Sequence, residues 1–149
     1  MSHTKLLTHI IFRTKKSQPT INYEHADDLY RYIWGIIKAK RCSLLFINGM
    51  PDHIHIFLQH PPDVTISELV RDIKASSSSW AKKSGFFPGF AGWASGYAAF
   101  SYSMRDKEMI VNYIKNQRAH HAQVSFKDEL RQLYEEFGIQ DKFQFFFVD

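Results

Sequence analysis

The chain has 149 residues, 44% hydrophobic and 23% charged, values typical of one soluble globular domain spanning residues 1–149. Its longest apolar runs are too short to cross a bilayer, and its N-terminus lacks the long apolar segment of a secretory signal. The single Cys42 excludes an intramolecular disulfide and a cysteine-based zinc site. We therefore expect a cytoplasmic protein with no membrane partner.

The first half of the chain predicts a strand, a helix and a hairpin. Leu6–Phe12 is an apolar run rich in Ile and Leu, followed by a basic loop, which favours a strand. Apolar residues recur at helical spacing from Glu24 to Lys40 and indicate an amphipathic helix. Ser43–Ile47 and His53–Leu58 are apolar runs joined by the turn-forming segment Asn48–Asp52, and this order predicts a hairpin.

The second half predicts a helix, a strand and two further helices. Thr65–Glu68 is a capping box that opens a helix with one apolar face. Tyr97–Tyr102 follows a glycine- and aromatic-rich loop and favours a strand. Residues 104–121 form the next predicted helix, and Ser125 caps a last helix that Gly138 ends.

This order is β-α-β-β-α-β followed by two helices, which is the ferredoxin-like arrangement of the α+β class. We expect an antiparallel sheet with helices packed on one face, leaving the opposite face for a ligand or another helix. The phenylalanine-rich tail, residues 143–147, is equally compatible with a terminal strand and with a cover for an apolar interface.

His53-Ile54-His55 is the first candidate functional motif. Two histidines one residue apart on a strand point to the same face, while Ile54 points to the other. Neutral imidazole is a common ligand of divalent metals, so the pair can hold one ion from one side. A half-buried strand whose polar face carries histidine explains the His-Ile-His motif alone equally well.

Tyr113 and Gln117 form the second candidate motif. Residues four apart on a helix share a face, so a phenol and an amide oxygen would project toward one neighbour. Tyrosine can act as a covalent nucleophile, and the Gln117 oxygen can complete the coordination of a metal. A core or interface aromatic is the more frequent use of a single tyrosine.

The remaining histidines suggest lesser roles. We expect His120 and His121 to be solvated or to cap a helix end, and His9 to be structural. Asp52 precedes the histidine pair and can orient one imidazole, although an aspartate in a turn needs no such role.

The net charge of +4 and pI near 9.2 favour a polyanionic partner. Lys74, on the second helix, is the leading candidate for a contact with a backbone phosphate. A solvated surface with scattered lysines accounts for the same charges equally well. The candidate DNA-binding residues are Arg13, Lys15, Lys16, Lys74 and Lys82.

Several spaced stretches, in this order, resemble the single-tyrosine HUH transposases of small bacterial insertion sequences and their relatives, the REP-associated tyrosine transposases. The similarity covers most of the chain. The stretches are Thr8–Lys15, Met50–His55, Gly96–Ser101, Tyr113–Gln117 and His120–His121.

This resemblance implies a divalent metal, Mg²⁺ or Mn²⁺, a homodimer whose active sites are shared between subunits, and a single-stranded DNA hairpin as substrate. It implies that His53, His55 and Gln117 bind the metal and that Tyr113 is the nucleophile. Tyr113 would become linked to a 5′-phosphate while a 3′-hydroxyl leaves, and another 3′-hydroxyl could later rejoin the DNA.

Two other functions remain compatible with the residues. A nonenzymatic module for single-stranded nucleic acid would use the aromatic side chains of a ferredoxin-like sheet and would need neither metal nor Tyr113. A metal-dependent phosphodiesterase would use water as its nucleophile, and Tyr113 would then only pack.

Overall fold

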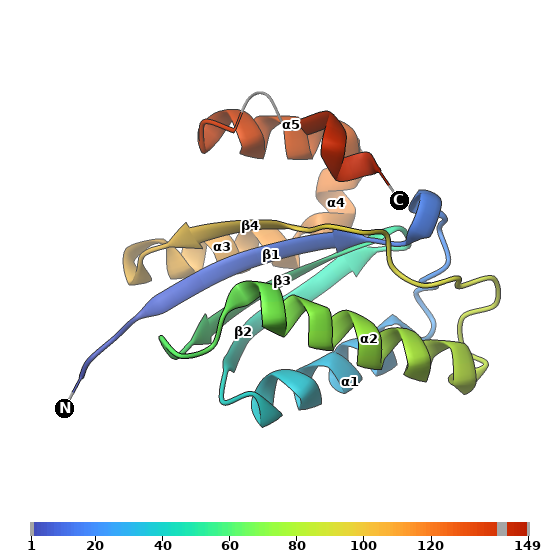
Figure 1. Cartoon of the computed structure of the whole chain (residues 1–149). Coiled ribbons are helices and arrows are strands. Elements are labelled where there is room, and N and C mark those ends of the chain that lie inside the picture. Colours follow the sequence, from blue (N-terminus) through green and yellow to red (C-terminus); the bar gives the residue numbers. More distant parts are fainter. Residues whose placement is uncertain (1, 140–142, 149) are drawn as a thin grey trace.

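The computed structural model describes residues 2–139 and 143–148 (Figure 1). Its strands are β1 (Leu6–Arg13), β2 (Ser43–Met50), β3 (His53–His60) and β4 (Ala98–Tyr102). They form an antiparallel sheet in the order β2-β3-β1-β4, which confirms the predicted ferredoxin-like α+β fold. β1 pairs with both β3 and β4, so the first strand lies in the interior of the sheet.

Helices cover both faces of this sheet. Figure 1 shows α1 and α2 on one side and α5 on the other. The face that the predicted core leaves free is therefore occupied by the C-terminal helices. The α-helices are α1 (Ala26–Ala39), α2 (Ile66–Ser84), α3 (Lys107–Lys115), α4 (Gln117–His121) and α5 (Phe126–Glu136). The 3-10 helices are η1 (Lys15–Ser17), η2 (Met104–Asp106) and η3 (Phe143–Phe147).

The alternation along β3 separates an apolar face from the face that carries the histidines. Ile54 and Ile56 are fully buried in the core that the sheet forms with α1 and α2. Phe57, on the opposite face, packs with Ile110 and Ile114 of α3. The predicted period of two is thus observed, and both histidines point toward α3, α4 and α5.

The predicted helix caps also form. The Thr65 hydroxyl accepts a hydrogen bond from the Glu68 amide at 3.3 Å, and α2 follows. The Ser125 hydroxyl accepts one from the Asp128 amide at 3.2 Å, and α5 follows. Gly138 has a φ of +71°, a conformation that favours glycine and ends the helix.

The predicted continuous helix over residues 104–121 is wrong in detail. The segment begins as η2, continues as α3 and is interrupted at Asn116 before α4. The Asn116 amide donates to the carbonyls of Asn112 and Ile114, so the turn tightens there. Tyr113 and Gln117 consequently lie on different helices.

The hairpin turn is shorter than predicted. Asn48 and Gly49 belong to β2, and only Pro51 and Asp52 connect the strands. A Cβ atom on Gly49 would lie 2.4 Å from the His53 carbonyl oxygen and 2.9 Å from the Ile54 Cα atom. Glycine is therefore required by the close approach of β3 rather than by a turn.

We expect Gly49→Ala to destabilise the protein, because both atoms that meet the new methyl group belong to the backbone of β3. Overpacking of this kind costs about 1–3 kcal/mol. Urea denaturation would measure the loss. Gly35→Ala is the matched control, since a Cβ atom at Gly35 meets nothing within 4 Å. Equal stability of the two variants would contradict this explanation.

The phenylalanine-rich tail forms η3 rather than a strand. Phe146 is buried in a cluster with Phe126, Leu130 and Tyr134 of α5. The tail thus covers apolar surface of its own chain. Among the described residues, no helix is both long and apolar enough to span a membrane.

Candidate active site

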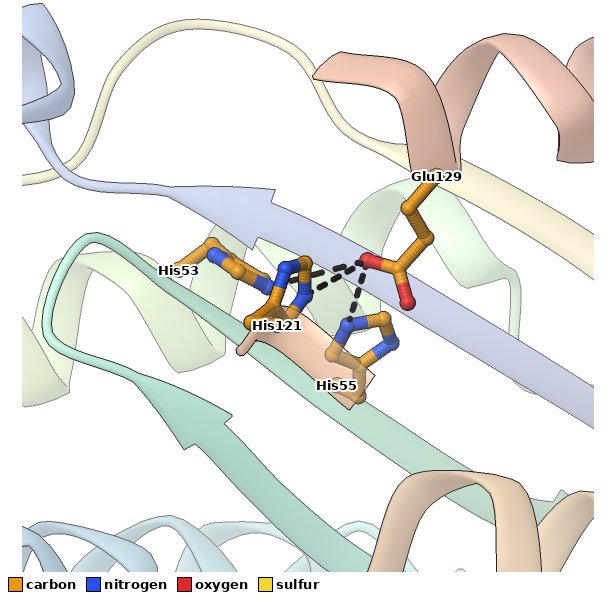
Figure 2. A group of neighbouring side chains, drawn as sticks. All are labelled: His53, His55, His121 and Glu129. Atoms are coloured by element: carbon orange, nitrogen blue, oxygen red, sulfur yellow. Dashed lines mark hydrogen bonds and ion pairs between the residues drawn. The ribbon is translucent and has the colours of Figure 1, made fainter. Parts of the chain in front are cut away.

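His53 and His55 form the floor of a buried polar cluster. Both side chains come from β3, and both residues have 0% exposure. Their Nε2 atoms lie 3.8 Å and 3.4 Å from one carboxylate oxygen, Oε1 of Glu129 (Figure 2). The histidine pair therefore faces an acidic side chain from α5.

Outer partners hold the other ring nitrogen of each histidine. His53 Nδ1 lies 2.7 Å from Asp52 Oδ1, and His55 Nδ1 lies 2.8 Å from His9 Nε2. When the Nδ1–H groups donate to these partners, each Nε2 presents a lone pair to the cluster. Asp52 thus contacts the imidazole that it was predicted to orient, and His9 has a polar partner within the site.

His121 and Glu129 complete the group that Figure 2 draws. His121 Nδ1 lies 2.8 Å from the Val124 carbonyl oxygen, and its Nε2 lies 3.1 Å from Glu129 Oε1. One ligand atom from each of His53, His55, His121 and Glu129 lies within 4.8 Å of the others. His121 is therefore part of the cluster rather than a solvated residue at a helix end.

The second oxygen of Glu129 holds the predicted nucleophile. The Tyr113 hydroxyl donates to Glu129 Oε2, and Gln117 Nε2 donates to the same atom at 2.9 Å. The Tyr113 and His55 rings are 6.1 Å apart between centroids. His120 Nε2 also lies 3.4 Å from this oxygen. The predicted tyrosine, glutamine and histidine pair thus meet in one chain.

Burial and charge set the protonation states of the site. Loss of solvation lowers the pKa of His53 to about 4. Burial, together with His55, lowers the pKa of His9 well below its ordinary value. Burial alone would raise the pKa of Glu129, but the hydrogen bond with His121 and the nearby His55 imidazole lower it instead. The site therefore favours a neutral His53 and an ionised Glu129.

The pKa of Tyr113, in contrast, is raised. Burial and the negative charge of Glu129 raise the pKa of its hydroxyl far above the ordinary tyrosine value. The phenol is therefore protonated at neutral pH, and its hydrogen bond to Glu129 fixes the direction of the hydroxyl. A positive charge near a bound phosphate would be needed to make this oxygen an effective nucleophile.

The buried polar atoms of the cluster fit a divalent cation. His53 Nε2, His55 Nε2 and Gln117 Oε1 are buried and have no hydrogen-bond partner among the described residues. Buried polar atoms normally find partners, and three acceptors beside one carboxylate have the chemistry that binds a cation. Imidazole, amide and carboxylate groups are all suitable donors to such an ion.

The candidate DNA-binding residues divide into a group with internal hydrogen bonds and an exposed group. Arg13 is 3% exposed, and its guanidinium donates to the Phe146 carbonyl and the Ser17 hydroxyl. Lys74 donates to the carbonyls of Ala94 and Gly96, and burial followed by the charge of Arg13 lowers its pKa to about 8. These two cations thus support loops and the tail.

Lys15, Lys16 and Lys82 are exposed. The Lys15 amide donates to the Gly92 carbonyl, and Lys82 Nζ approaches the position of a Cβ atom on Gly92 to 3.8 Å. The glycine-rich loop therefore brings Lys15 and Lys82 to one edge of the molecule.

Glu129 was missed by the sequence analysis, although the sequence carries a signal. On α5 the apolar residues Phe126, Leu130 and Leu133 are buried, and Glu129 lies on the same side with 1% exposure. A carboxylate on the apolar side of an amphipathic helix is unusual and indicates a buried partner. That pattern would have indicated a buried partner for Glu129 without identifying the histidines.

The fold and the cluster define a class of protein. It is a ferredoxin-like domain in which a tyrosine lies beside two histidines of β3, an interior strand of the sheet. Residues 2–117 match the family described as transposase IS200 like, so the chain belongs to the IS200-like transposase family. No protein with a curated description matches the chain significantly.

Two solved structures are similar to the chain. A provisionally assigned transposase from Deinococcus radiodurans R1 is 26% identical, with a TM-score of 0.63, over 78% of this chain and 93% of that one. A REP-associated tyrosine transposase bound to a REP hairpin is 15% identical, with a TM-score of 0.63, over 83% of this chain and 73% of that one. The second similarity concerns the fold alone.

Proposed function

We propose that this transposase cleaves and rejoins single-stranded DNA at hairpin-bearing element ends through a covalent 5′-phosphotyrosine intermediate. Residues 1–149 would act as one HUH transposase domain. The observation that carries the proposal is the meeting of Tyr113 with His53 and His55 around Glu129. A nucleophile and a candidate metal site then lie side by side, as the reaction requires.

Tyr113 supplies the attacking oxygen in this proposal. A bond forms between its hydroxyl oxygen and phosphorus, the bond to the 3′-oxygen breaks, and the departing 3′-oxygen ends with a proton. The number of phosphoester bonds is unchanged, so rejoining needs no nucleotide cofactor. Glu129 orients the attacking hydroxyl through the hydrogen bond that it accepts.

His53, His55 and Gln117 would hold a divalent ion, Mg²⁺ or Mn²⁺. When bound, such an ion polarises a phosphate oxygen and offsets the charge that develops on it. Asp52 and His9 keep the imidazoles oriented through the Nδ1 contacts. Gln117 is a weaker candidate than the histidines, because an amide oxygen is a weak ligand that water can replace.

A single-stranded DNA hairpin is the proposed substrate. Support comes from family membership and from the hairpin bound to the structurally similar REP-associated transposase. Lys15 and Lys82, which border the same loop, are the proposed phosphate contacts. The buried Arg13 and the internally bonded Lys74 would act by supporting this region.

Incubation with end-labelled hairpin DNA and Mn²⁺ tests the proposal. We expect a protein–DNA adduct that survives denaturation, and mass spectrometry should locate it on Tyr113. A nonenzymatic binding module would bind the hairpin without forming any adduct. A phosphodiesterase that uses water would cleave the DNA and also leave no adduct. Either result would replace the proposed function.

The proposed dimer raises the question of which subunit supplies Tyr113. Sharing between subunits was predicted from the family resemblance. In the present fold α3 packs through Ile110 and Ile114 against its own sheet, and Asn48 donates to the carbonyls of Ile114 and Lys115. These contacts form within one chain here, whereas a dimer with shared sites would form the equivalent contacts between subunits.

Coexpression of Tyr113→Phe with His55→Ala would distinguish the two assemblies. If each chain builds its own site, the mixed dimers should remain inactive, because neither subunit has both the tyrosine and the histidine pair. Shared sites would restore one complete site per mixed dimer and hence a substantial part of the cleavage. Two affinity tags, purified in sequence, would verify that mixed dimers are present.

A further inference from the structure

His121 and Glu129 belong to the part of the chain beyond the family match, which ends at residue 117. The family similarity therefore assigns these two residues no role. Glu129 is nevertheless the side chain on which the whole cluster converges. The two carboxylate oxygens of Glu129 have different neighbours. Oε1 lies near three histidines, while Oε2 accepts hydrogen bonds from Tyr113 and Gln117.

The three histidines approach Oε1 in the same way. The Nε2 atoms of His53, His55 and His121 lie 3.8, 3.4 and 3.1 Å from this oxygen (Figure 2). Zn²⁺, which binds four ligands tetrahedrally at about 2.0–2.1 Å, separates its ligand atoms by about 3.3–3.4 Å. The three distances to Oε1 are close to this value, and all four ligand atoms lie within 4.8 Å of one another.

The outer contacts of the histidines also follow the pattern of a metal site. Nδ1 of each ring meets an outer partner: the Asp52 carboxylate, the His9 ring and the Val124 carbonyl. Metal-bound histidines usually donate their second N–H to such groups. Two of the inward Nε2 atoms, those of His53 and His55, are fully buried without a hydrogen-bond partner in the described chain.

We propose that His121 and Glu129 bind the same ion as His53 and His55, which gives a three-histidine, one-carboxylate site for a first-row transition ion. The inference rests on the proposed function, in which His53 and His55 hold the ion. It adds a ligand from the end of α4 and another from α5. The C-terminal segment thereby becomes part of the active site.

Gln117 has an additional role in this arrangement. Its Nε2 group donates to Glu129 Oε2 at 2.9 Å and thus holds the carboxylate in place. The Tyr113 hydroxyl donates to the same oxygen, so the metal ligand also orients the nucleophile. Through Nε2, Gln117 thus also positions Glu129, while its Oε1 stays directed to the proposed ion, and its loss should weaken metal binding less than the loss of Glu129.

The ligand set also selects the metal. Imidazole nitrogen is a good ligand for transition ions, whereas Mg²⁺ prefers oxygen ligands and retains water. Three imidazoles and one carboxylate should therefore bind Mn²⁺ more tightly than Mg²⁺. Of the two metals that the resemblance implies, the site favours Mn²⁺.

Calorimetric titration of the full chain with Mn²⁺ tests the role of Glu129 without DNA or cleavage. Glu129→Gln should lower the affinity by about 100-fold or more, at or above the upper end of the effect expected for an outer partner. Glu135→Gln is the matched control, because it makes the same change at an exposed position of α5. Its affinity should equal that of the parent protein.

Pulsed electron paramagnetic resonance of bound Mn²⁺ tests His121 directly. Nitrogen couplings should report three coordinated imidazoles in the parent protein and two in His121→Ala. A purely structural role of His121 would give two coordinated imidazoles in both proteins. This spectrum is recorded on the metal-bound fraction, so partial unfolding of a variant does not imitate the expected change.

The outcomes separate this inference from the proposed function. Parent-like Mn²⁺ affinity in Glu129→Gln, or an unchanged imidazole count in His121→Ala, would overturn the additional ligands. If His53→Ala in the same assay abolished binding, the metal pair of the proposed function would still stand. Equal affinity for Mg²⁺ and Mn²⁺ in the parent protein would refute the selection of a transition ion.

Discussion

Tyr113→Phe is expected to reduce the denaturation-resistant protein–DNA adduct to background while leaving hairpin binding nearly unchanged. The substitution removes the hydroxyl that would attack phosphorus and retains the ring that packs near His55 and His120. Adduct formation on a labelled hairpin and a gel-shift measurement of the same protein would compare chemistry with binding.

Folding must be measured beside that reaction, because the lost hydroxyl also donates to Glu129. A hydrogen bond to a charged group contributes about 1.5–3 kcal/mol, so the variant is expected to fold at 25 °C with a lowered melting temperature. Tyr134→Phe is the matched control, since it removes a hydroxyl from a buried tyrosine outside the cluster. An undiminished adduct in Tyr113→Phe would disprove the assignment of the nucleophile.

Features that depend on residues close together in the sequence were the most predictable. The alternation of β3 placed His53 and His55 on one face because the period of a strand is fixed by backbone geometry. The caps at Thr65 and Ser125 also formed as expected, since each contact spans only three residues. Local rules are sufficient where the partner is a neighbour in the chain.

The contact of Glu129 with the histidines could not be predicted by any local rule. Glu129 meets His53 and His55 only because α5 folds back over the sheet. Its helix is amphipathic whether or not a carboxylate lies on the buried side, so the helix prediction was correct while the site remained incomplete. His121 was underestimated for the same reason, because its partner Glu129 comes from another helix.

Lys74 was predicted as a DNA contact, but the structure gives its ammonium group internal partners. Its position on a helix and its charge predicted a phosphate contact, but its ammonium instead donates to the carbonyls of Ala94 and Gly96. A lysine on an amphipathic helix can reach either solvent or a neighbouring loop, and sequence does not decide between them. The loop from residue 85 to 97 decides here, because it crosses beside α2 and presents its carbonyls.

His55→Ala is expected to abolish cleavage while hairpin binding falls only slightly, and a chelator should have the same effect on the parent protein. Charge stabilisation of the phosphate acts mainly in the transition state, so its loss affects the rate more than the affinity. A loss of about 4 kcal/mol corresponds to about a thousandfold in rate.

The buried position of His55 makes a control on the same strand necessary. His60→Ala removes a partly exposed histidine of β3 that bonds Thr8 and lies outside the cluster. This variant should cleave at nearly the parent rate, and adding Mn²⁺ back after chelation should restore the parent protein but not His55→Ala. Full activity of His55→Ala in chelator would exclude a metal-dependent site, because neither the imidazole nor the ion would then be needed to offset the charge of the phosphate.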